Sequence, residues 1–300
     1  MSTRVAAPVR WAPAAAGLVV MGLLCQEVGA SLAVLVFPSV GAAGMVTLRL
    51  SFSAIILLLV ARPRMRGHGR AAWLTVIGFG VALAAMNSLF YQALVHLPLG
   101  AAVAIEMLGP LTLSVVAGRR VLSLVWAFLA LVGIALFGWS GLLGANLAGV
   151  LFALGAGALW AAYILLSART GASFPRLDGL AIAMSIAALG TLPIGIASAG
   201  ARLVAPHIAL IGLGVAVLSS AVPYGLELTA LRTLPARTFS VLMSLAPAVA
   251  ACIGLVILHQ GLEVTDALAI LFVVAAGVGA VLTTSPRPVP GAVLAPESPR

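Results

Sequence analysis

The stretch NSLFYQALVHLPLGAAVAIEMLGP, from Asn87 to Pro110, decides how the rest of the chain is interpreted. It predicts the end of one apolar helix, a break over residues 97–100, and a second helix that contains Glu106. A carboxylate at bilayer depth costs about 2.5–3.5 kcal/mol, so such groups usually face a bundle interior or a water-filled path. Pro110 lacks an N–H and therefore frees the carbonyl group of Glu106. The pattern predicts a functional acid beside a helix break, with a purely structural hydrogen bond as the alternative.

Composition indicates a polytopic membrane protein. The 300 residues are 63% hydrophobic and 8% charged, with a mean hydropathy of +1.22. Soluble domains carry about 25% charged residues. Cys25 and Cys252 each fall within an apolar run, which predicts packing residues rather than a disulfide or a metal site. The sequence contains no metal-binding, nucleotide-binding or nucleophile motif, so we expect no metal, no cofactor and no enzymatic activity.

Apolar runs of about 20 residues, the length that a bilayer requires, predict an all-α protein with ten transmembrane helices. The segment FPSVG, at 37–41, is expected to turn the chain between the first two. The run after Arg10 is too long for a signal peptide. The expected helices cover about 11–36, 42–61, 71–95, 99–117, 121–139, 147–168, 178–198, 207–232, 236–258 and 265–284.

The arginines predict the orientation of these helices. With ten spans both termini lie on one side, and only Arg202 falls on the opposite side, while Arg49 lies within a span. Cytoplasmic loops carry an excess of basic residues, so both termini are expected in the cytoplasm. The net charge of +9 is then a topology signal, and we exclude nucleic-acid binding. The arginines on the N-terminal side are Arg4, Arg10, Arg62, Arg64, Arg66, Arg70, Arg119, Arg120, Arg169, Arg176, Arg232, Arg237, Arg287 and Arg300.

An internal repeat joins the two halves of the chain. Sliding the first half along the sequence lays Leu-Pro at 97–98 on Leu-Pro at 234–235, and Pro110 on Pro247. The same helix–break–helix feature is therefore expected twice.

Each half holds five expected spans, so the second half should be inserted upside down relative to the first. Inverted repeats are typical of secondary transporters, which bind substrate near the midplane where the repeats meet. The expected domains are a first repeat at 11–139, a second repeat at 147–284, and a disordered cytoplasmic tail at 285–300.

Four charged residues lie inside the expected spans: Glu27, Arg49, Glu106 and Glu227. At 1.5 Å per residue, Glu27 lies roughly 15 Å before the turn at 37–41 and Arg49 about 12 Å after it. These depths predict an ion pair between Glu27 and Arg49, which could serve transport or only join two helices. Glu227 could contact a substrate or bond a neighbouring helix.

Further candidates occur in pairs, each on one face of a predicted helix. Asn87 and Tyr91 lie four residues apart, and Tyr224 lies three residues before Glu227. Trp160 and Tyr163 could line a cavity, although aromatic pairs at this spacing also occur as plain packing.

The chain resembles the EamA-type branch of the drug/metabolite transporter superfamily, and more closely the inner-membrane threonine/homoserine exporters. The resemblance supports tests of Arg49, Asn87, Tyr91, Glu106, Tyr224, Glu227 and Arg237. It rests on GASLAVLVFP (29–38), TLRL (47–50), NSLFYQAL with PLGAAVAIEMLGPL (87–111), LGAGALWAAYI (154–164), VPYGLELTAL (222–231) and LPARTFSVLMSLAPAVAA (234–251).

Two positions depart from this family pattern. Ala246 stands where the relatives usually have an acid before the second proline, and Gln260 stands where another acid usually ends the ninth span. Glu27 occupies a position expected to be neutral and polar, which suggests the hypothesis that it compensates for the missing acids.

The resemblance implies export of small amino acids or related metabolites across a bacterial inner membrane, by alternating access and proton exchange. Backbone groups freed near Pro110 and Pro247 would hold the substrate, and Glu106 would carry the proton. A multidrug exporter for lipophilic cations is the alternative within the class, and a non-transporting scaffold or sensor is the alternative outside it. A homodimer is left open.

Overall fold

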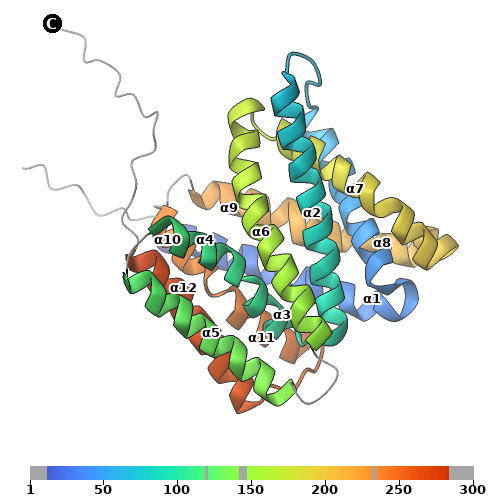
Figure 1. Cartoon of the computed structure of the whole chain (residues 1–300). Coiled ribbons are helices and arrows are strands. Elements are labelled where there is room, and N and C mark those ends of the chain that lie inside the picture. Colours follow the sequence, from blue (N-terminus) through green and yellow to red (C-terminus); the bar gives the residue numbers. More distant parts are fainter. Residues whose placement is uncertain (1–11, 119–120, 142–146, 232–233, 235, 284–300) are drawn as a thin grey trace, which may run out of the picture.

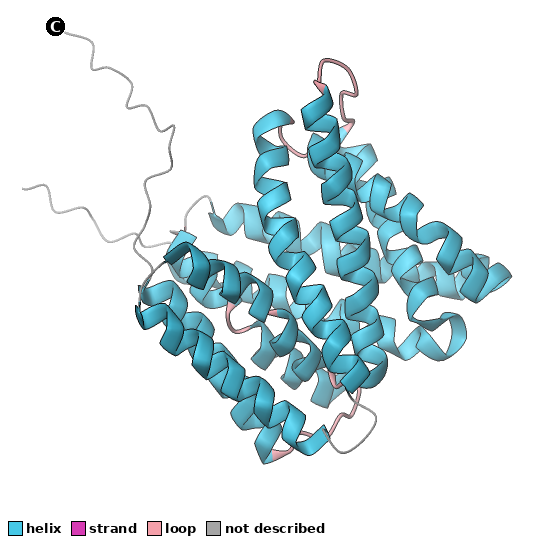
Figure 2. Ribbon diagram, viewed as in Figure 1, coloured by secondary structure: helices cyan, strands magenta, loops and turns pink. Residues whose placement is uncertain are grey.

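The computed structural model describes residues 12–118, 121–141, 147–231, 234 and 236–283. These residues form helices and connecting turns without a strand, which confirms the predicted all-α class (Figure 2). The helices are α1 (Ala12–Ala61), α2 (Arg70–His96), α3 (Leu99–Glu106), α4 (Leu108–Gly118), α5 (Val121–Gly141), α6 (Leu147–Ser173), α7 (Asp178–Ala199), η1 (Gly200–Val204), α8 (Pro206–Ala216), η2 (Val217–Ala221), α9 (Val222–Leu231), α10 (Ala236–Met243), α11 (Ala246–Ile257) and α12 (Val264–Thr283).

Helix α1 is two apolar arms joined by a kink at the predicted turn. Pro38 lies inside it, and Gly41 has a non-helical conformation with φ of 70°. A positive φ costs glycine little because it has no Cβ. Arg202 donates from Nη1 to the carbonyl oxygen of Ser39 at 3.3 Å and so joins η1 to the kink.

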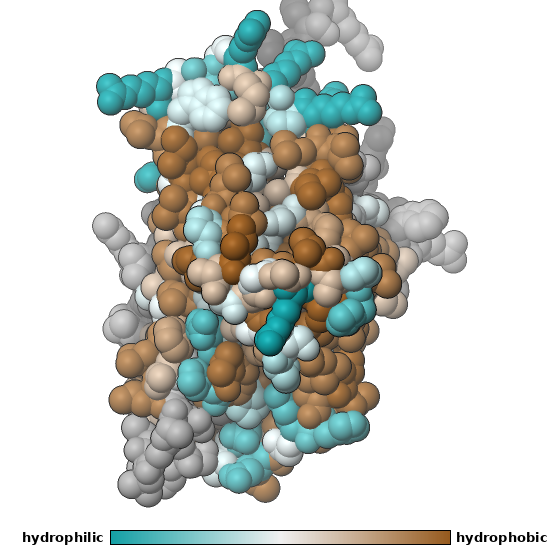
Figure 3. Space-filling view, turned by 90° about the vertical axis from the view of Figure 1, so that its right-hand side faces the viewer, coloured by the Kyte–Doolittle hydropathy of each residue, from teal (hydrophilic) through white to brown (hydrophobic). Residues whose placement is uncertain are grey.

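Six helices in the described residues are long and apolar enough to cross a bilayer, and two shorter apolar helices accompany them. In the side view of Figure 3, hydrophobic side chains cover most of the face, and hydrophilic ones gather at its upper end and in smaller patches below. This surface fits a protein whose outer side chains contact lipid. The six are Ala14–Ala61, Arg70–His96, Leu147–Ser173, Asp178–Val204, Thr238–Ile257 and Val264–Thr283.

Helices from the two halves of the chain pack against each other as antiparallel pairs (Figure 1). The second arm of α1 packs on α7, where the hydroxyl of Thr47 donates to the carbonyl oxygen of Thr191 at 3.0 Å. At one end of this pair, the backbone N–H of Arg64 donates to Asp178 at 3.1 Å. In the same way α5 packs on α12, and α3 on α11.

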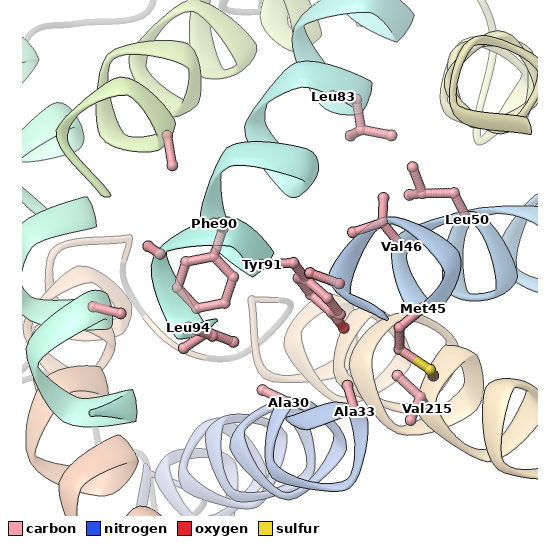
Figure 4. Close-up of a cluster of buried hydrophobic side chains, with 14 of the residues drawn as sticks. Ala30, Ala33, Met45, Val46, Leu50, Leu83, Phe90, Tyr91, Leu94 and Val215 are labelled. Carbon is pink, nitrogen blue, oxygen red and sulfur yellow. The ribbon is translucent and has the colours of Figure 1, made fainter. Parts of the chain in front are cut away.

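The centre of the bundle is filled by side chains from α1, α2 and α8 (Figure 4). Tyr91 of α2 has no exposed surface and points toward α1, among Met45, Val46 and Ala33. Phe37 at the α1 kink packs on the Tyr91 ring with a centroid separation of 5.8 Å. This core fixes α2 against both arms of α1.

Helices α4 and α6 meet at two glycines. A Cβ at Gly109 would overlap the backbone of Gly157, and a Cβ at Gly157 would lie 2.6 Å from the carbonyl oxygen of Glu106. Small residues allow transmembrane helices to approach closely. The glycines therefore set the distance between α6 and the break that follows α3.

We expect Gly109→Ala to lower the stability of the protein, because the added methyl group must push α4 away from α6. Overpacking of this kind costs about 1–3 kcal/mol. The matched control is Gly190→Ala on α7, where an added Cβ meets nothing within 4 Å. The measurement is thermal unfolding in detergent. Equal melting temperatures for the two variants would contradict the close approach.

Candidate functional site

A cavity of about 240 Å³ lies between the two halves of the bundle. Its walls come from α1, α2, α3, α6, α7, η2, α10 and α11. Six of the predicted site residues line it: Glu27, Arg49, Asn87, Glu106, Trp160 and Tyr163. Residues that are distant in the sequence therefore meet at one place.

Two carboxyl groups face this cavity, although both residues are buried. Glu27 of α1 is 2% exposed, and Glu106, at the end of α3, is 9% exposed. Among the described residues, Oε2 of Glu27 has no hydrogen-bond partner. Such buried acids are expected on substrate and proton pathways.

Arg49 supplies the positive charge of the cavity. Its Nη1 donates to the hydroxyl oxygen of Tyr91 at 3.3 Å, and its Cζ lies 5.5 Å from the centre of the Tyr91 ring. That distance is within the range of a cation–π contact. Arg49 and Glu27 line the same cavity, and the ion pair between them stays a prediction.

Tyr91 gives Arg49 a partner between the two arms of α1. Glu27 comes from the first arm and Arg49 from the second, and both side chains line the same cavity. Tyr91 of α2 lies between these arms and accepts the hydrogen bond from Arg49. Tyr91 therefore belongs to the site as the residue that orients the guanidinium group.

Asn87 is held by its own helix. Its Nδ2 donates to the carbonyl oxygen of Leu83 at 2.8 Å, and the residue is 5% exposed. This bond fixes the amide group at the cavity wall, one helical turn before Tyr91.

Both predicted helix breaks are present just before a proline. Helix α3 ends at Glu106 and α4 begins at Leu108, ahead of Pro110; α10 ends at Met243 and α11 begins at Ala246, ahead of Pro247. Pro110 lines a second, more apolar cavity of about 310 Å³. Trp160 and Met243 line both cavities, so they form the wall between them. Pro247 is buried and lines neither cavity.

Ala246 and Gln260, the two departures from the family pattern, lie in different parts of the structure. Ala246 lines the first cavity beside Met243. Gln260 lies at one end of the bundle, where its Oε1 accepts a hydrogen bond from the backbone N–H of Leu99 at 3.0 Å. The amide thereby caps the start of α3.

Three predicted site residues lie outside the described part of the structure, and two residues that line the cavity were not predicted. The side chains of Tyr224, Glu227 and Arg237 lie outside the described part of the structure, and so does the tail at 285–300. Sequence reasoning missed the two serines of η2, Ser219 and Ser220, which line the cavity. The signal that could have found them is a pair of adjacent hydroxyl residues in an apolar helix, shortly before a proline.

The cavity offers chemistry for a small zwitterion. Carboxylates suit an ammonium group, a guanidinium group suits a carboxylate, and the amide and hydroxyl groups can bind either partner. The described residues contain no group of three or more His, Cys, Asp and Glu that could hold a metal ion. A charged cavity between halves of an apolar bundle, bordered by interrupted helices, is the arrangement of a membrane transporter.

Comparison with known proteins also indicates a membrane transporter. Residues 147–283 match the model of the EamA-like transporter family. A protein of Salmonella typhimurium strain SL1344 called threonine/homoserine exporter RhtA is 40% identical over 284 residues, which are 93% of this chain and 94% of the relative. The Escherichia coli K12 protein of the same name is 41% identical over 279 residues, 91% of this chain and 92% of the relative. The chain belongs to the EamA-like transporter family.

A solved structure, described only as the crystal structure of a protein, shares the fold. It superposes with a TM-score of 0.60 at 17% identity, over 91% of this chain and 98% of the other. Membership of the family confirms that the chain is a membrane transporter rather than an enzyme.

We expect Tyr91→Phe to remove the hydrogen bond that Arg49 donates to the hydroxyl group of Tyr91. A hydrogen bond to a charged group contributes about 1.5–3 kcal/mol. The measurement is a double-mutant cycle on unfolding in detergent, with Arg49→Met as the second change. Loss of the hydroxyl should destabilise the protein when Arg49 is present and have little effect in the Arg49→Met background. An equal effect in both backgrounds would contradict the assigned bond.

Proposed function

We propose that the protein exports threonine, homoserine or closely related small amino acids across the bacterial inner membrane. The observation that carries this proposal is the cavity that brings Glu27, Glu106 and Arg49 together within an apolar bundle. The name of the relatives at 40% and 41% identity, threonine/homoserine exporter, supports the substrate class.

The size of the cavity favours a small solute. Pockets for drug-sized ligands measure about 300–1,000 Å³, whereas this cavity measures about 240 Å³. An export site must also release its substrate, and a site with only a few polar contacts can do so. A lipophilic-cation exporter would place its cargo against the more apolar second cavity, which lies behind Trp160 and Met243.

Transport would proceed by alternating access between two inverted five-helix repeats with ten spans. Three helix pairs support this arrangement, because α1 with α7, α3 with α11 and α5 with α12 each join corresponding segments of the two halves. Corresponding helices related by a two-fold axis in the membrane plane must run antiparallel when they meet, and these do. The breaks before Pro110 and Pro247 also correspond.

Protons would drive export through the two buried acids. In the outward-open form Glu106 would take up a proton, and in the inward-open form it would release the proton and leave a carboxylate for the ammonium group of the substrate. Arg49, held by Tyr91, would bind the substrate carboxylate. Both termini would lie in the cytoplasm, on the side of the arginine-rich loop at 62–70.

The first test uses purified protein in liposomes and labelled threonine or homoserine. Wild type should show saturable exchange and accumulation driven by a pH gradient. Glu106→Gln should lose the response to the gradient, because the amide cannot carry a proton. The matched control is Glu263→Gln, an exposed acid outside the cavity, which should behave as wild type.

Three results would change the proposed proton site, substrate class or function. A gradient response that persists in Glu106→Gln would move the proton to Glu27 or Glu227. Absence of exchange for both amino acids in wild type would contradict the substrate class, and uptake of a cationic dye would then identify a drug exporter. A protein inactive toward all of these, whose acid variants lose only stability, would be a scaffold or sensor.

A second test concerns Glu27. If this acid compensates for the neutral Ala246 and Gln260, Glu27→Gln should flatten the pH dependence of exchange while the protein stays folded. Transport with an unchanged pH profile would eliminate Glu27 from the proton pathway.

A further inference from the structure

Two adjacent serines bring hydroxyl groups to the cavity that Glu27, Arg49 and Glu106 also line. Ser219 and Ser220 are 4% and 5% exposed, and both line the cavity. They belong to η2, a π-helical turn between α8 and α9. Isolated π-turns inside α-helices occur often at functional sites.

The π-turn has a visible cause in the sequence. Pro223 has no N–H to donate to the carbonyl group of Ser219, four residues earlier. The N–H of Val222 instead donates to the carbonyl oxygen of Val217, five residues earlier. The wider turn is thus fixed where the two serines meet the cavity.

The hydroxyl groups of these serines keep hydrogen-bonding capacity for a ligand. Among the described residues, Oγ of Ser219 has no hydrogen-bond partner although it is buried. Ser53 donates to Oγ of Ser220 at 3.0 Å, which leaves the proton of Ser220 for another acceptor. A buried polar group without a partner costs about 1–3 kcal/mol, so an unpaired hydroxyl beside a cavity points to a ligand.

Helix α1 makes room for this arrangement. A Cβ at Gly29 would overlap the hydroxyl group of Ser219 and lie 3.1 Å from Cβ of Leu218. Only glycine at this position lets η2 approach α1 with the serine side chain in place. The neighbouring Glu27 and Ala30 line the cavity from the same arm.

We infer that Ser219 and Ser220 form a subsite that binds the side-chain hydroxyl of the transported amino acid. The inference rests on the proposed function, in which Arg49 and the two acids bind the zwitterionic end. Threonine and homoserine are isomers whose hydroxyl groups lie on neighbouring carbons. Two adjacent serine hydroxyls can exchange hydrogen bonds with either position, which accounts for recognition of both compounds.

The test compares hydroxylated substrates with α-aminobutyrate, the compound that results when the hydroxyl is removed from either isomer. In liposome exchange, wild type should prefer threonine and homoserine over α-aminobutyrate by at least about tenfold in kcat/KM, since a missing partner leaves a buried hydroxyl unpaired. In Ser219→Ala the preference should fall to about twofold or less, through slower transport of the hydroxylated substrates. Exchange of α-aminobutyrate should be kept, which shows that the variant is folded.

The matched control is Ser244→Ala. Ser244 is also 4% exposed, but it lines the second cavity and not the first. Its variant should keep the wild-type preference. Ser220→Ala provides a second test if Ser219→Ala does not fold, and it should lower the preference in the same direction.

The outcomes separate this inference from the proposed function. If wild type exchanges threonine and α-aminobutyrate equally well, or if both serine variants keep the preference, the subsite is wrong while the exporter stands. If wild type exchanges no amino acid, the proposed function fails and the subsite fails with it.

Discussion

The cost of placing charged side chains inside an apolar bundle is the constraint on which the rest of this structure depends. Glu27, Arg49 and Glu106 are buried or partly buried in a bundle whose outer surface is largely hydrophobic. Each charge would be expensive alone in a bilayer, and the helices bring all three to one cavity. Tyr91 supports the guanidinium group, and the close approach of Gly109 and Gly157 holds the break after Glu106 in place.

A polar cavity at the junction of two halves has a consequence for movement. The helix pairs that join the halves are antiparallel, and the breaks before Pro110 and Pro247 lie on α3–α4 and α10–α11, which border the cavity. A rocking motion of the halves would change access to the charges without unfolding a helix. The shared wall of Trp160 and Met243 separates the charged cavity from the apolar one, so a polar cargo and an apolar one would meet different surroundings.

Much of the fold could be predicted from local patterns. Apolar run length and the segment at 37–41 predicted the helices and the kink of α1, and the two prolines predicted the breaks. Distance along the helices also predicted similar depths for Glu27, Arg49 and Glu106, and all three line one cavity. The ten-span inverted topology and the roles of Tyr224 and Glu227 stay predictions.

What could not be predicted depended on direction around the helix axis and on the packing of distant segments. Arg49 contacts Tyr91 because α2 places a tyrosine between the two arms of α1. Ser219 reaches the cavity because Pro223 shifts a hydrogen bond and Gly29 leaves room, and neither effect has a periodic signal in the sequence. Such contacts depend on the tertiary structure.

The most direct test of the central claim is equilibrium binding of labelled homoserine to the purified protein, measured by scintillation proximity. We expect saturable binding that unlabelled threonine displaces and that a lipophilic cation such as tetraphenylphosphonium does not. Displacement by the cation alone, or absence of saturable homoserine binding, would contradict a cavity built for a small hydroxylated zwitterion.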